Sequence, residues 1–236
     1  MRLMIAVAAL AVSGIAISQT TSNPATPVAI ELFTSQGCSS CPPADAFAEQ
    51  LGKEPNTVIL TRPVTYWDRL GWKDTLAREE NTRLQQAYAQ RGGVGSGVYT
   101  PQAVVQGGSA AVGSSQAELR RLIVAEQRKS GPSVRATALS DGGRTVSIGA
   151  AGASAGEVLV VALKANTVVR IGSGENGGRT VRYTNVVLAE TSVGQFKGDA
   201  ATITVPAKLM KRAGADRYAL IIRSGAAGRI IAARYI

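Results

Sequence analysis

The chain has 236 residues, of which 45% are hydrophobic and 5% are aromatic, and its formal net charge is +10. This length allows one large domain or two small ones, and the hydrophobic content is that of a globular protein with a buried core. The sequence contains two cysteines and no histidine, so most metal sites would lack their usual ligands. The few aromatic residues make nucleic acid a poor candidate for a partner.

The first 18 residues have the pattern of a secretory signal peptide. Arg2 supplies the positive start, residues 3–15 form an apolar run, and Ala16 and Ser18 are small residues where signal peptidase reads the chain. A membrane anchor is the alternative, but the run is shorter than the roughly 20 apolar residues that cross a bilayer. We therefore expect cleavage after Ser18, a polar tail at 19–26, and a periplasmic or secreted mature chain without a transmembrane segment.

The positive charge is concentrated in the second half. Residues 19–130 contain 11 Lys and Arg against 10 Asp and Glu, a net charge of +1, whereas residues 131–236 contain 14 against 6, a net charge of +8. Such a surface attracts anionic lipid headgroups, cell-wall polymers or acidic proteins. An anionic component of the cell envelope is therefore a candidate partner, and solubility through net charge is the alternative explanation.

The segment from 27 to 130 predicts elements in the order βαβ and then ββα. Strands are expected at 28–33 and 56–66, with Pro63 indicating an edge or a bulge in the second. After a stretch rich in glycine, a turn into a strand is expected at 99–108, ending in a Gly-Gly hairpin, with the return strand at 109–112. Helices are expected at 42–51, 75–91 and about 114–129.

Beyond residues 130–132 the pattern changes to short strands separated by glycine-rich turns. These strands are expected at 134–139, 145–148, 157–165, 167–171, 179–188, 200–205, 218–223 and 229–235. Such a series suggests an antiparallel sandwich or barrel. The sequence thus predicts an α/β domain at 27–130, with a mixed sheet flanked by helices, and a basic, all-β, sandwich-like domain at 131–236.

Cys38 and Cys41 stand at the start of the predicted helix 42–51. Such a pair can cycle between dithiol and disulfide, because a helix N-terminus stabilises the thiolate of the first cysteine. Export places the pair in an oxidising compartment where a disulfide persists. Two sulfurs do not complete a tetrahedral zinc site, and Met210 is the sole methionine of the mature chain, so no metal and no other cofactor is expected.

The expected mechanism assigns different roles to the two cysteines. Cys38, nearer the exposed loop, should attack as the thiolate, and the more buried Cys41 should resolve the mixed disulfide. A permanent disulfide that only staples the loop is the alternative. A loop this short gains little stability from a crosslink, which favours a redox role.

The order of elements, with the cysteine pair after the first strand, resembles the thioredoxin fold. A closer resemblance is to a secreted, thioredoxin-like family of unknown function, found in bacteria and plants, and it covers nearly the whole mature chain. The phrases that carry it are ELFTSQGCSSCPPAD at 31–45, YWDRLGWKD at 66–74, VYTPQ at 98–102 and GENGGR at 174–179. The resemblance implies a thioredoxin-like fold and an exported location, but no established reaction.

The resemblance also implies a site. Pro101 should follow a cis peptide bond and face the cysteines, and its missing N–H leaves the strand edge open to a substrate backbone. The implied catalytic residues are Cys38, Cys41 and Pro101. Residues that could line the site are Ser39, Ser40, Pro42, Thr100, Trp67 and Asp68. For Trp67, and for Trp72 beside it, packing in the core or under a lid is the alternative.

One departure from the family pattern concerns proton transfer. Family members commonly carry a histidine and an aspartate shortly before the Tyr-Trp-Asp phrase, whereas residues 62–65 here are Arg, Pro, Val and Thr. The remaining candidate acids and bases are Glu31, Asp45 and Asp68. For each of them a solvated, structural role is expected rather than a catalytic one, with Asp45 capping or facing the helix start.

The sequence therefore predicts thiol–disulfide exchange with the thiols and disulfides of exported proteins. The alternative is a binding or structural envelope protein that keeps the fold and a structural disulfide. The polar, glycine-rich cluster at 175–179 is predicted to be a hairpin turn. A loop docked against the first domain, close to the cysteines, is the alternative for this cluster.

Overall fold

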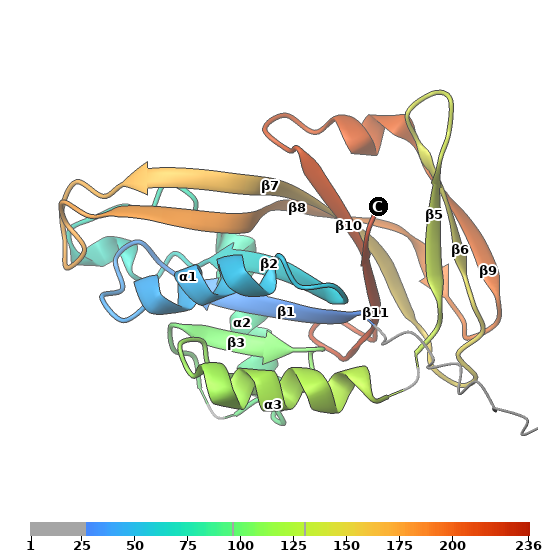
Figure 1. The fold of residues 1–236 in the computed structure, drawn as a ribbon, viewed down its shortest axis with the longest axis horizontal. Helices are drawn as coiled ribbons and strands as arrows, with labels where there is room; N and C mark the ends of the chain where they lie inside the picture. Colours follow the sequence, from blue (N-terminus) through green and yellow to red (C-terminus); the bar gives the residue numbers. More distant parts are fainter. Residues whose placement is uncertain (1–26, 96, 130) are drawn as a thin grey trace, which may run out of the picture.

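The computed structural model describes residues 27–236 apart from residues 96 and 130. The expected signal peptide at 1–18 and the expected tail at 19–26 lie outside the described residues. The described chain forms an eight-stranded mixed sheet, a separate three-stranded sheet and three α-helices (Figure 1). A mixed α/β fold is thus confirmed.

The N-terminal half contributes four neighbouring strands and all three α-helices. In chain order these are β1 (Val28–Thr34), α1 (Pro42–Leu51), β2 (Thr57–Pro63), α2 (Glu79–Arg91), β3 (Gln102–Val105), β4 (Ser109–Val112) and α3 (Gln116–Gln127). β1 pairs in parallel with β2, and α1 makes the crossover between them. On its other side β1 pairs antiparallel with β3, which pairs with the edge strand β4.

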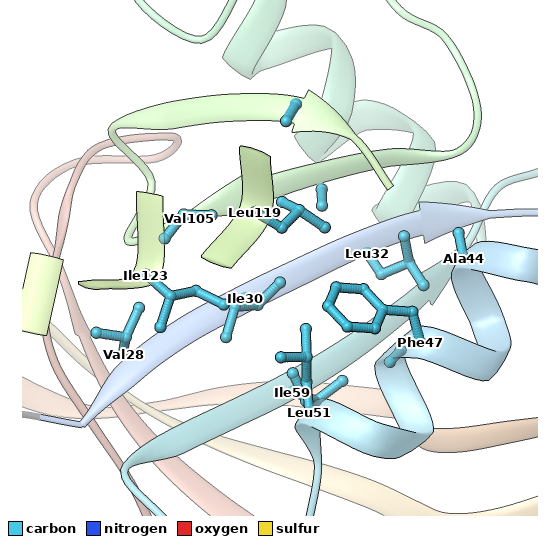
Figure 2. Close-up of a cluster of buried hydrophobic side chains, with 13 residues drawn as sticks. Val28, Ile30, Leu32, Ala44, Phe47, Leu51, Ile59, Val105, Leu119 and Ile123 are labelled. Atoms are coloured by element: carbon cyan, nitrogen blue, oxygen red, sulfur yellow. The ribbon is translucent and has the colours of Figure 1, made fainter. Parts of the chain in front are cut away.

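A hydrophobic core between the sheet and the helices α1 and α3 fixes the position of α1 (Figure 2). Alternate residues of β1 point to this face, because side chains alternate along a strand. The apolar residues of α1 recur every three or four positions, which gives the helix one apolar side. These buried residues include Ile30 and Leu32 of β1 and Ala44, Phe47 and Leu51 of α1. The start of α1, where the cysteines lie, is therefore held against the sheet.

The C-terminal half contributes seven strands. They are β5 (Val134–Ala138), β6 (Arg144–Ile148), β7 (Gly156–Arg170), β8 (Thr180–Phe196), β9 (Ala201–Val205), β10 (Arg217–Arg223) and β11 (Ile230–Tyr235). Four of them extend the large sheet, whose order is β11-β10-β7-β8-β2-β1-β3-β4. The two halves meet where β8 pairs in parallel with β2 at Thr61 and Val186.

This continuous sheet differs from the expected sequence of an α/β domain and a separate sandwich. Only β5, β6 and β9 form a sheet of their own, which packs on one face of β7, β10 and β11. The opposite face of β7 and β10 packs against Val58 and Leu60 of β2. β10 and the first half of β7 are apolar on both faces because both faces are covered. The sandwich is therefore confined to one end of the molecule, at the right of Figure 1.

The predicted hairpin turn at 175–179 connects β7 and β8, but the hairpin is longer than the sequence predicted. The ladder runs from Gly156 opposite Phe196 to Arg170 opposite Thr180, so the expected strands 157–165 and 167–171 are one strand. Asn166 had indicated a break between them, but it is an exposed residue within the paired strand, opposite Thr184. The hairpin tip lies at the same end of the molecule as the loop before α1 (Figure 1).

The remaining helical elements lie around this core. α2 (Glu79–Arg91) packs its Tyr88 against Phe33, on the face of β1 opposite to α1 and α3. It begins at Glu79 rather than at residue 75, because Arg78 has an extended backbone. Two short 3-10 helices complete the fold, η1 (Asp68–Leu70) and η2 (Ala207–Lys211). Within the described residues, none of the helices is long and apolar enough to cross a membrane.

Four charged side chains form a buried network where the two halves meet. Arg62 of β2 donates to Glu31 of β1 at 2.7 Å and to Glu190 of β8, and Arg223 of β10 donates to the same two carboxylates at 2.7 and 3.4 Å. Burial raises the pKa of Glu190, but the two guanidinium charges outweigh burial and lower it to about 2. Arg62, which lies in the stretch that departs from the family pattern, thus has a structural role.

Candidate functional site

Cys38 and Cys41 form a disulfide at the beginning of α1. Cys41 is the N-cap residue, and its carbonyl accepts the main-chain N–H groups of Ala44 and Asp45. Pro42 occupies the first position of the helix, where a main-chain N–H would have no partner within the helix. Both sulfurs therefore lie at the positive end of a helix that is ten residues long.

Both cysteines are completely buried, with 0% of each residue exposed. The expectation that Cys41 is more buried than Cys38 is therefore wrong. Ser39 and Ser40, between them, are exposed. The Cys38 sulfur is 3.4 Å from the Ser40 hydroxyl oxygen, so it lies next to the exposed turn.

The peptide bond between Thr100 and Pro101 is cis, as expected. This segment lies beside the cysteine turn, because the Ser40 hydroxyl donates to the Thr100 carbonyl oxygen at 3.5 Å. Trp67 holds the same segment through a hydrogen bond from its indole N–H to the Thr100 hydroxyl at 2.8 Å. The structure thus brings together Cys38, Ser40, Thr100 and Trp67 from three separate parts of the chain.

The loop from 67 to 75 supports the turn before the cysteines. The Trp72 indole donates to the Gln36 side-chain oxygen at 2.8 Å, and the Gln36 main-chain N–H donates to Asp74 at 2.8 Å. Asp68 accepts the main-chain N–H of Asp74 at 3.1 Å, so its recorded contact is within the loop. Both tryptophans are half-buried, and their N–H groups are used for support.

Asp45 is the candidate acid that lies nearest in sequence to the disulfide. It is 2% exposed, and one of its carboxyl oxygens accepts the Thr34 hydroxyl at 2.8 Å while the other has no partner. Burial raises its pKa to about 8, against a smaller opposing effect of the Thr34 hydrogen bond. The expected solvated position at the helix start is therefore wrong. Glu31, the other buried candidate, is held in the ion network by Arg62 and Arg223.

The tip of the β7–β8 hairpin covers the cysteine turn. The Asn176 side-chain amide donates to the carbonyl oxygens of Gln36 and Cys38, at 3.0 and 2.7 Å. The Glu175 carboxylate accepts the Ser39 main-chain N–H at 3.3 Å. The docked loop, stated as the alternative for residues 175–179, is therefore confirmed.

Sequence reasoning missed several of these supporting residues. Asn176, Gln36, Asp74 and Thr34 bind main-chain groups or buried carboxyls at the site, yet each is an ordinary polar residue in a turn or at a strand end. Asn176 offered one signal, since it stands between Gly174 and the pair Gly177 and Gly178. Such a position allows a tight turn that aims one side chain inward.

Residues 29–223 match the family described as "Protein of unknown function (DUF1223)". Among solved structures, the chain is similar to protein AGR_C_4864 from Agrobacterium tumefaciens, with 28% identity over 91% of this chain and 96% of that one, and a TM-score of 0.79. HBP35 of Porphyromonas gingivalis shares the fold alone, at 13% identity over 92% and 76% of the two chains, with a TM-score of 0.57. No curated protein matches the chain significantly.

Proposed function

Because this chain belongs to the DUF1223 family of proteins of unknown function, its activity has to be inferred from its site, and we propose thiol–disulfide exchange through Cys38 and Cys41. The observation that carries the proposal is a disulfide at the N-terminus of α1 beside the cis bond before Pro101. A helix N-terminus favours the thiolate that the exchange requires. Two residues between the cysteines allow the disulfide to open and close without moving the helix.

The order of β1, α1 and β2, followed by β3, β4 and α3, supports a thioredoxin-like assignment for the N-terminal half. In that arrangement the parallel pair β1 and β2 carries the cysteines at the end of β1. The antiparallel pair β3 and β4 begins directly after Pro101. The four C-terminal strands that extend the sheet are then additions to this unit.

The reaction transfers two electrons between the cysteine pair and a protein dithiol. A substrate thiolate attacks the Cys38 sulfur, forms a mixed disulfide and releases Cys41 as a thiolate. The second substrate thiolate then attacks the substrate sulfur of the mixed disulfide and displaces Cys38 as a thiolate. The substrate is thereby oxidised to a disulfide, and the cysteine pair is reduced. The reverse sequence reduces a substrate disulfide. Cys38 is the attacked sulfur because it lies next to the exposed Ser40.

Asp45 is placed to exchange a proton with Cys41. The two residues are four positions apart at the start of one helix, a spacing that puts their Cβ atoms about 5–6 Å apart. With a pKa of about 8, Asp45 is mostly protonated at neutral pH and can supply the proton that the released Cys41 thiolate takes up. Its unpartnered carboxyl oxygen is free for this contact.

The proposed setting is the periplasm or the cell exterior, with protein thiols and disulfides as substrates. The signal-like first 18 residues support export, and an oxidising compartment supports a persistent disulfide. The net charge of +8 in residues 131–236 supports contact with an anionic envelope component.

A purely structural disulfide is the second candidate, and the complete burial of both cysteines favours it. A buried disulfide is protected from thiolates in solution, as expected for a protein that uses this fold only for binding. Exchange activity separates the two candidates.

The test is turnover of a fluorescent peptide disulfide with glutathione as the electron donor. We expect turnover by the wild type and its loss in Cys38→Ser and Cys41→Ser. Cys41→Ser should also accumulate a mixed disulfide between Cys38 and the peptide, detected by mass spectrometry. Glutathione is left out of this incubation, so that neither Cys41 nor glutathione supplies a thiolate to resolve the mixed disulfide.

The matched control is Ser147→Ala, an exposed substitution on β6 that keeps both sulfurs. It should turn over the peptide at the wild-type rate. Absence of turnover in the wild type, together with absence of a trapped intermediate in Cys41→Ser, would reject exchange and leave the structural disulfide.

A further inference from the structure

The buried side chain of Asn176, at the hairpin tip, contacts the cysteine turn. We use the name cap segment for the hairpin tip at residues 172–179. Asn176 is 1% exposed, whereas the other seven residues of the cap segment are exposed. Its side-chain amide bridges two carbonyl oxygens of the turn, those of Gln36 and Cys38. A buried amide with two such bonds positions the main chain on both sides of Gly37.

The cap segment has its own internal support. Main-chain hydrogen bonds link Gly177 to Gly174, Gly178 to Ile171 and Arg179 to Asn176, at 2.9, 2.8 and 3.1 Å. Gly174 and Gly178 have φ values of 74° and 82°, which other residues rarely adopt. Its own hydrogen bonds therefore order the cap segment, so that Asn176 docks on the cysteine turn with little further loss of conformational entropy.

A second contact attaches the cap segment to the loop that supports the cysteine turn. A Cβ added at Gly172 would lie 2.7 Å from the Trp72 ring, so only glycine allows this close approach. The Ser173 hydroxyl donates to the Gly71 carbonyl oxygen at 2.6 Å. Trp72 in turn donates to Gln36. The cap segment and the loop 67–75 therefore enclose the turn from two sides.

Apart from the contacts of Gly172 and Ser173 with the loop 67–75, three hydrogen bonds among the described residues join the cap segment to the cysteine turn. Asn176 supplies two hydrogen bonds, Glu175 one at an exposed position, and the Asn176 side-chain oxygen is buried without a partner. An unsatisfied buried oxygen is costly, and it offsets part of what the amide bonds contribute. The docking of the cap segment on the turn therefore rests on few polar bonds, and both cysteines of the turn are completely buried.

We propose that Asn176 is a positioning residue that gates the Cys38–Cys41 disulfide: it latches the cap segment over the turn, and a substrate thiol reaches Cys38 only after the latch opens. This inference rests on the proposed exchange activity. Opening frees the carbonyl oxygens of Gln36 and Cys38, which can then accept main-chain N–H groups. The substrate class that fits this change is a cysteine-containing polypeptide in an extended conformation.

The experiment is reduction of the oxidised full chain by dithiothreitol, quenched with a maleimide and followed by mass spectrometry. Gating predicts that the wild-type rate reaches a plateau at high dithiothreitol, where opening limits the reaction. Asn176→Ala and Asn176→Asp remove both donated bonds, so their rates should stay proportional to dithiothreitol and exceed the wild-type rate by about 10-fold or more.

Asn166→Ala is the matched control, because Asn166 is an exposed residue on β7 of the same hairpin. It should keep the wild-type plateau. Thermal unfolding of the oxidised variants separates gating from loss of structure, since gating changes the reduction rate of a folded chain. If the Asn176 variants do not fold, the exposed double variant Ser173→Ala and Glu175→Gln loosens the same segment and should raise the rate in the same direction.

The outcomes distinguish this inference from the proposed function. A wild-type rate that stays proportional to dithiothreitol and equals the rate of folded Asn176→Ala would overturn gating and leave exchange standing. Fast reduction of Asn176→Ala without peptide turnover in any variant would support the gate and reject exchange. Resistance of both proteins until they unfold would reject both.

Discussion

At the scale of single residues, Asp45 is the group whose chemistry differs most from its usual behaviour. It is buried beside Thr34 at the start of α1, and its folded pKa of about 8 lies far above the ordinary value of 3.8. At a pH between 3.8 and about 8, Asp45 is protonated in the folded chain and ionised in the unfolded chain. The contribution of Asp45 to stability is therefore fully present below the lower pKa and is lost as the pH rises through the upper one.

We predict that Asp45→Asn flattens this pH dependence. The amide cannot ionise, so the variant escapes a loss of up to about 1.4 kcal/mol per pH unit in the free energy of unfolding. Urea unfolding of oxidised protein at about pH 5 and about pH 7.5 measures the difference. The variant should gain stability relative to the wild type at the higher pH.

Asp199→Asn is the control, because Asp199 is exposed on the opposite half of the chain. It should follow the wild-type pH dependence. Equal slopes for the wild type and Asp45→Asn would show that Asp45 ionises normally in the folded chain, and its proposed role as a proton donor would fall with it.

The sequence alone identified the cysteines and Pro101, but not the residues that surround them. A cysteine spacing and a Thr-Pro dipeptide are local signals, readable without knowing the fold. Burial is not local: Cys38 is covered by Asn176, which lies 138 residues further along the chain. The difference in burial between Cys38 and Cys41 and the solvation of Asp45 were therefore mispredicted for the same reason.

At the scale of elements, the buried network of Glu31, Arg62, Glu190 and Arg223 connects β1, β2, β8 and β10. Arg62 is 2% exposed and contacts both carboxylates. Removing one member of a balanced buried network leaves a charge without compensation in a medium that solvates it poorly. The network thus makes the junction between the halves sensitive to single substitutions.

We predict that Arg62→Met lowers the free energy of unfolding by about 3–5 kcal/mol. The double variant Glu31→Gln and Arg62→Met should lose less than the sum of the single losses, because it leaves one arginine and one carboxylate in balance. Urea unfolding measures each value. As a control, Lys53→Ala removes an exposed ion pair with Glu49 and should cost less than about 1 kcal/mol.

A loss below about 1 kcal/mol in Arg62→Met would contradict the structural role of the network. A loss in the double variant equal to the sum of the two single losses would also contradict it.

The elements themselves were predicted unevenly. α1 and β4 have their expected bounds, since the apolar spacing of one and the glycine turn before the other are strong local patterns. The length of the β7–β8 hairpin was missed because Asn166 indicated a break between the expected strands 157–165 and 167–171. Pairing along the full ladder outweighs that local signal.

At the scale of the whole molecule, the two halves are one sheet, joined where β2 meets β8. These two strands pair at a single position, Thr61 with Val186, and so short a pairing has no pattern that could be recognised in the sequence. Strand content and the position of the basic charge were predictable from composition. The placement of the hairpin tip over the cysteines was not, because it depends on that junction.

We propose that Cys38 and Cys41 form a working redox couple beneath the cap segment. The reduction potential of the pair tests this most directly, from equilibration of the wild type with glutathione or dithiothreitol buffers and quantitative trapping of free thiols. We expect a potential in the range of exchange proteins, about −120 to −270 mV. A potential below about −300 mV is typical of structural disulfides and would contradict it.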